Sequence, residues 1–175
     1  AKGLLKMACR MDDPVLFMEH KGLYRQGYAA TDEPDSDYII PFGKGRFVTN
    51  GNYLTLVTWG AMVQKSVEAV QELLLEENIV EIIDLRTLNP IDFDILEVSI
   101  NKTGKVLIVH EDNLTNGPGA EISAMINEQF FEYLDGPIKR VAAKDSPIPF
   151  NWVIEEKILP QTKDISNAIE ELLEY

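Results

Sequence analysis

The chain has 175 residues, 45% of them hydrophobic and 26% charged, which predicts a buried core and argues against disorder. Its 29 acidic and 16 basic residues give a formal net charge of -13, which disfavours nucleic acid as a partner and suits a basic one. The sequence contains no apolar run long enough to cross a bilayer, and its single cysteine fits a reducing compartment.

The first 46 residues predict the end of one domain followed by a linker. Residues 1–10 have the pattern of an amphipathic helix, and residues 15–18 form an apolar run typical of a strand. Residues 27–46 show no clear periodicity and are rich in acidic residues, glycine and proline. We therefore expect residues 1–26 to be the tail of a preceding domain and residues 27–46 to be a linker.

From residue 53 onward, strand patterns alternate with helix patterns. The predicted strands cover residues 54–59, 80–85, 105–109 and 138–143. The predicted helices cover residues 63–74, 92–102, 119–134 and 164–173. This alternation predicts one α/β domain over residues 47–175, with three layers, a mostly parallel sheet and helices on both of its faces.

The segment after the third predicted strand is the most informative one for function, because ligands and partners gather at strand-to-helix loops of open α/β sheets. His110, Glu111 and Asp112 open this segment. They fit an acid/base cluster or, as we favour, a polar loop at a subunit contact. The later Gly-Pro-Gly turn is not a dinucleotide fingerprint, because Ile122 stands where a third glycine is needed.

Two further groups of polar residues are candidates for binding. The turn around Cys9, Asp12 and Asp13 offers carbonyl oxygens of the kind that bind a monovalent cation. The C-terminal region carries an excess of acidic residues, which suits either a basic partner or simple solubility. The acidic residues of this region are Glu155, Glu156, Asp164, Glu170, Glu171 and Glu174.

Five segments, in order, resemble the beta subunit of the thiamine-diphosphate-dependent 2-oxo acid dehydrogenases, the E1 component. These segments are residues 13–25, 54–60, 81–90, 110–111 together with 119–122, and 145–149. The resemblance covers nearly the whole chain. It implies that residues 47–175 are similar to the C-terminal domain of the transketolase superfamily. Residues 1–26 then resemble the last helix and strand of the pyrimidine-binding domain.

The resemblance also implies which roles these residues have and lack. The parent enzyme decarboxylates a 2-oxo acid on thiamine diphosphate and passes the acyl group to a lipoyl arm. The thiamine diphosphate and Mg²⁺ sites and all catalytic residues lie outside this stretch, so we expect the chain alone to be inactive. The segment holding Cys9, Asp12 and Asp13 matches part of a structural potassium site.

The implied partners are the E1 alpha subunit or alpha half, a second beta copy, and the basic subunit-binding domain of the E2 acyltransferase. Assembly and docking are therefore the expected roles of this part of the enzyme. The expected interface residues are His110, Glu111, Asp112, Glu170, Glu171 and Glu174.

The segment beginning at His110 resembles branched-chain members more than pyruvate members, so we expect a branched-chain substrate. Pyruvate and acetoin dehydrogenases remain alternatives, and a non-catalytic α/β interaction module is the rival from another class. We expect a cytoplasmic location in a bacterium, or the mitochondrial matrix in a eukaryote, with the cytoplasm favoured.

Overall fold

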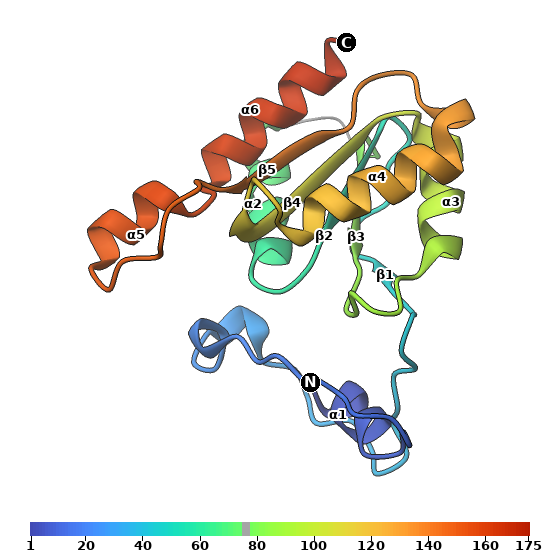
Figure 1. Ribbon diagram of the computed structural model, residues 1–175, viewed down its shortest axis with the longest axis vertical. Coiled ribbons are helices and arrows are strands. Elements are labelled where there is room, and N and C mark those ends of the chain that lie inside the picture. The colour runs from blue at the N-terminus through green and yellow to red at the C-terminus, as the bar shows by residue number, and fades with distance from the viewer. Residues whose placement is uncertain (75–77) are drawn as a thin grey trace.

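The computed structural model describes residues 1–74 and 78–175, in which an N-terminal segment lies to one side of an α/β part (Figure 1). The N-terminal segment contains α1 (Lys2–Ala8) and the 3-10 turns η1 (Lys21–Leu23) and η2 (Gly27–Ala29). The predicted first helix is therefore confirmed. The predicted strand at residues 15–18 is wrong, because none of the described strands lies beside this segment to share hydrogen bonds.

The described part of the chain forms a five-stranded sheet in the order β1-β3-β2-β4-β5. The strands are β1 (Arg46–Phe47), β2 (Leu54–Thr58), β3 (Val80–Asp84), β4 (Val106–Asn113) and β5 (Lys139–Ala143). β2 pairs in parallel with β3 and β4, β4 pairs in parallel with β5, and only β1 runs antiparallel, along the edge of β3. The mostly parallel sheet is therefore confirmed. The sequence did not predict β1, because a strand of two residues shows no alternating pattern.

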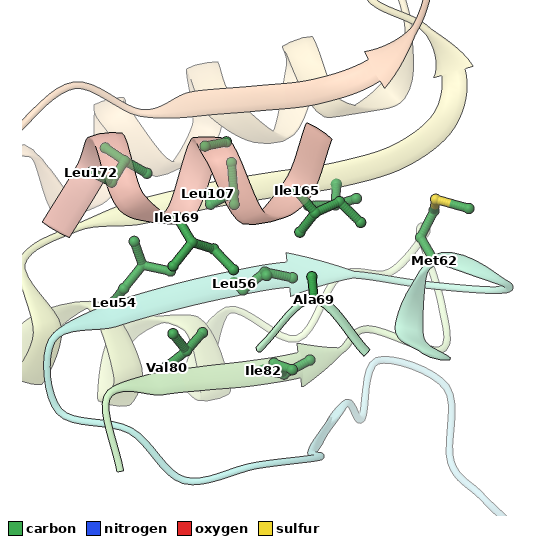
Figure 2. Packing of buried hydrophobic residues seen from close by; sticks show 12 residues of the cluster. Leu54, Leu56, Met62, Ala69, Val80, Ile82, Leu107, Ile165, Ile169 and Leu172 are labelled. Carbon is green, nitrogen blue, oxygen red and sulfur yellow. The ribbon is translucent and has the colours of Figure 1, made fainter. Parts of the chain in front are cut away.

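Two helices cover each face of the sheet, which confirms the predicted three layers. α2 (Met62–Glu72) and α6 (Thr162–Leu173) pack on one face, where Ile165, Ile169 and Leu172 lie over the apolar side chains of β2 and β4 (Figure 2). α3 (Phe93–Thr103) and α4 (Pro118–Phe130) pack on the other face. Successive strand residues point to opposite faces, and β2, β3 and β4 each contribute buried apolar side chains to both cores.

Local signals explain where the helices begin and end. Asp92 caps α3 by accepting a hydrogen bond from the Ile95 amide, and Gly104 ends that helix with a φ of 66°. Gln161 and Asp164 form a capping box at the start of α6. The main-chain amide of Gly45 donates to Asp92 at 2.9 Å, so the same aspartate also fastens the end of the predicted linker.

Three elements end at other residues than the sequence predicts, and one helix was not predicted. α2 ends before Leu74, which has a φ of 48° and is 90% exposed rather than part of the buried stripe. β4 continues through His110 to Asn113, since it stays paired with β5 across an irregular register. α4 ends at Phe130 and is followed by the 3-10 turn η3 (Phe131–Tyr133). Helix α5 (Trp152–Ile158) was not predicted, and it has no buried residue.

Candidate functional site

The strand order places a topological switch point between β2 and β4. From β2 the chain crosses first to β3 on one side and later to β4 on the other. The helices that follow β2 and β4 are α2 and α4, which lie on opposite faces of the sheet. Ligands of open α/β sheets bind in the crevice outside the carboxyl ends of two such strands. The residues at this point are therefore the first candidates for a site.

Trp59 and His110 occupy this switch point. Trp59 directly follows β2, and His110 lies in the second half of β4. Their rings are stacked, with centroids 5.4 Å apart and planes 6° apart. Beneath them the Thr58 hydroxyl donates to the Val109 carbonyl at 2.9 Å, which ties the ends of the two strands together.

His110 is 0% exposed, and burial lowers the pKa of its imidazole, against a smaller opposing effect of the Asp112 charge. The edge of the ring rests on the glycines at the start of α4. A β-carbon on Gly119 would overlap the ring, and one on Gly117 would come within 2.9 Å of its Cε1 atom. Within the described residues neither ring nitrogen has a hydrogen-bond partner. Its burial and the lack of a described partner both favour the neutral form of the ring.

Glu111 and Asp112 lie beyond His110 in β4 and reach the surface, whereas His110 does not. The predicted polar loop at 110–112 is thus the end of a strand. Nε2 of His20 lies 3.0 Å from Oε2 of Glu111, within hydrogen-bond distance. This contact joins the N-terminal segment to the sheet. Glu111, which we predicted to lie at a subunit interface, thus makes a contact within its own chain. The interface role of His110, Glu111 and Asp112 stays a prediction.

The other predicted site residues lie apart from the switch point. Cys9, Asp12 and Asp13 are exposed in and after the turn that ends α1, where the amides of Arg10 and Met11 already occupy two carbonyl oxygens. The role of this turn in a potassium site stays a prediction. In residues 1–74 and 78–175, no group of three or more His, Cys, Asp or Glu side chains is placed to hold a metal ion.

Glu170, Glu171 and Glu174 are exposed on and just beyond the last turns of α6. Glu171 forms an ion pair with Lys139 at the start of β5, so it is partly neutralised. Glu170 and Glu174 have no ion-pair partner among the described side chains. Their predicted docking role remains a prediction.

Two surface grooves are additional features that sequence reasoning did not identify. A groove of about 530 Å³ lies between the segments that follow β4 and β5, where the amide and hydroxyl of Thr115 donate to Asp145. These two hydrogen bonds lower the pKa of the Asp145 carboxyl. A second groove of about 640 Å³ runs along α4 and η3. Its lining includes Ala120, Ala124, Asn127, Phe131, Asp135 and Pro137.

Comparison with known proteins identifies the fold. Residues 43–165 match the family model of the transketolase C-terminal domain. The chain belongs to this family. The solved structure of a split-gene transketolase, as an inactive beta4 tetramer, matches with a TM-score of 0.66 and 26% identity, covering 80% of this chain and 44% of that one.

A second solved structure supports the fold alone. It is the 2-oxoglutarate:ferredoxin oxidoreductase from Magnetococcus marinus, with 2-oxoglutarate, coenzyme A and succinyl-CoA bound. It matches the transketolase C-terminal domain described here with a TM-score of 0.50 and 15% identity, over 74% of this chain and 19% of that one.

Relatives with named functions are similar to this chain along its whole length. The pyruvate dehydrogenase E1 component subunits beta of Staphylococcus epidermidis and Staphylococcus aureus are each 41% identical over all 175 residues. The resemblance to E1 beta subunits is therefore confirmed. The chain spans 53% of the length of these relatives. Among the described residues, no helix combines the length and hydrophobicity needed to cross a membrane.

Proposed function

We propose that this transketolase C-terminal domain is part of the beta subunit of a 2-oxo acid dehydrogenase E1 component that acts on pyruvate. The observation that carries the proposal is the 41% identity, along the whole chain, to subunits named for pyruvate dehydrogenase. These names do not support the branched-chain substrate expected from the segment at His110. The pyruvate alternative fits them better.

The proposed role of the domain is assembly. When thiamine diphosphate is bound in the parent enzyme, it supplies the carbanion chemistry. We place its site and that of Mg²⁺ outside these residues, as the resemblance implies, and we assign no reaction step to this chain. The proposed partners are the alpha subunit and a second beta copy. The exposed, free thiol of Cys9 suits a reducing compartment, so we propose a cytoplasmic location.

A substrate comparison tests the proposed activity. The beta subunit that contains this domain, purified together with its alpha subunit, is expected to decarboxylate pyruvate. The kcat/KM for this reaction should exceed that for decarboxylation of 3-methyl-2-oxobutanoate and that for cleavage of acetoin, which has no carboxyl group to lose. In parallel, calorimetry should detect no binding of thiamine diphosphate and Mg²⁺ to the 175-residue chain alone. A preference for the branched-chain acid would contradict the choice of pyruvate, and activity on none of the three would favour a non-catalytic module.

The acidic end of α6 is our proposed contact for the basic subunit-binding domain of an E2 acyltransferase. Glu170 and Glu174 support it, because both carboxylates are exposed and neither is neutralised by a described cation. Exposed charges of this kind speed the encounter of opposite charges more than they strengthen the complex. Salt screens such charges over roughly 8 Å at physiological ionic strength.

Replacing Glu170, Glu171 and Glu174 together with glutamine is therefore expected to slow association with that domain several-fold at low salt and much less at high salt. Stopped-flow mixing of the intact complex components at two salt concentrations measures the rates. The matched control replaces three exposed glutamates of α3 and α4, namely Glu97, Glu121 and Glu128. Equal slowing by both triple variants would show that only net charge matters, and the α6 contact would be rejected.

A further inference from the structure

The switch-point crevice of this domain is closed by two of its own side chains. His110 and Trp59 stack there, and the imidazole is 0% exposed. The chain makes room for the ring at Gly119, where a β-carbon would overlap it. A β-carbon on Gly117 would overlap the Asn113 carbonyl oxygen and would also come within 2.9 Å of the ring. The place where related sheets admit a ligand is thus filled by a titratable group.

The surroundings of the ring suit a neutral imidazole and oppose a charged one. The ring edge that carries Nε2 faces the first turn of α4, whose amides form the positive end of the helix dipole. Gly117 caps this helix without a side-chain hydrogen bond, and Pro118 supplies no amide hydrogen. A proton on the buried ring would therefore have no described acceptor and would meet a field of the same sign.

Charged groups around the ring do not reverse this balance. The Asp112 carboxylate on β4 favours a charged ring, but it is exposed and accepts from the Asn113 amide. Arg140 on β5 opposes a charged ring. Glu121 lies exposed in the first turn of α4, and Glu111 is already paired with His20. The turn after β2, residues 59–61, carries no ionisable side chain.

We propose that His110 is a proton-sensitive latch on the switch-point crevice. The neutral ring holds Trp59 and the first turn of α4 together over the ends of β2 and β4. When a ring nitrogen takes a proton from solvent, the ring leaves its buried position and the crevice opens. Because Glu111 is the next residue of β4, opening also loosens the contact that joins His20 and the N-terminal segment to the sheet.

Proton linkage fixes the direction and the size of the effect. The pKa of His110 is lowered in the closed form, so the closed form is fully favoured above the ordinary imidazole value of about 6.5 and is lost as the pH falls below it. Between the ordinary and the lowered pKa, one bound proton raises the open population about tenfold per pH unit. The proposal does not depend on which substrate the parent enzyme uses.

The chain has two histidines and two tryptophans, so the signal of each can be assigned with one substitution. A Trp152→Phe background leaves Trp59 as the single indole emitter. From pH 8 to pH 5, its emission is expected to change with a midpoint below 6.5. Over the same range, amide exchange at Gly119 and Ala120 should accelerate about tenfold per pH unit, after correction for the intrinsic rate.

His110→Gln in this background should abolish both changes, whereas the matched variant His20→Gln should keep them. Amides of the central strand β2 should stay protected throughout, because the opening is local. The latch is rejected if the first turn of α4 keeps its protection at pH 5, if the emission change persists in His110→Gln, or if β2 loses protection at the same pH.

A measurement on the unsubstituted chain covers the case in which His110→Gln does not fold. The Cε1 protons of the two histidines give two NMR signals, which are assigned with His20→Gln. The signal of His110 should titrate at the same pH as the exchange of the Gly119 amide. Titration of His110 at a different pH from this exchange would overturn the proposal.

Discussion

Replacing Gly51 with alanine is expected to lower the free energy of unfolding by about 3 kcal/mol. Gly51 is buried where the chain passes the start of β3, and a β-carbon at this position would overlap the main chain at Val80 and Glu81. Main-chain atoms of a central β-sheet do not yield as a flexible side chain does. The conflict would be relieved only by moving the segment before β2 away from the edge of β3. Urea unfolding followed by circular dichroism measures the loss.

Gly27→Ala is the matched control for this change. Gly27 opens η2, and a β-carbon there would meet no atom within 4 Å. The control is expected to stay within about 0.5 kcal/mol of the unsubstituted chain. If Gly51→Ala were equally harmless, the close approach of the chain to β3 would not be a constraint on the fold.

Much of the sheet was predictable because its strands are short apolar runs. β2, β3 and β5 lie where their sequences indicate, and the alternation of strands and helices correctly predicts three layers. β1 escaped notice because two residues carry no period. α5 escaped because Trp152, Val153 and Ile154 are all exposed, so this helix has no apolar stripe that distinguishes a buried face.

The switch point shows where sequence reasoning ends. A histidine after four apolar residues suits a loop as well as a strand, and the local pattern contains no sign of its burial. What buries His110 is a stack on Trp59, 51 positions away, together with glycines that come later in the chain. Only the crossing order of the strands brings these residues together. Parallel pairing of β2 with β4 is the single fact that would have predicted the contact.

Lys102→Met is expected to lower the free energy of unfolding by about 2–3 kcal/mol, because it leaves a buried carboxylate without its charged partner. Lys102 lies on α3 and donates to Glu81 Oε1 of β3, and the Glu81 side chain is 2% exposed. The Gly51 amide is the other donor to this oxygen, at a long 3.4 Å, and the second carboxylate oxygen has no described partner. Methionine keeps the apolar stem, so the change removes the ammonium group and little packing.

Lys139→Met provides the contrast, since Lys139 pairs with Glu171, whose side chain is 62% exposed. An exposed pair contributes at most about 1 kcal/mol, so this control should lose much less stability than Lys102→Met. Adding Glu81→Gln to Lys102→Met should recover part of the loss, because a neutral amide costs less to bury than a carboxylate. The test compares the urea unfolding midpoints of the unsubstituted chain, Lys102→Met, Lys139→Met and the double variant Lys102→Met with Glu81→Gln. If Lys102→Met matched Lys139→Met and gained nothing from Glu81→Gln, the ion pair between α3 and β3 would be only a surface contact.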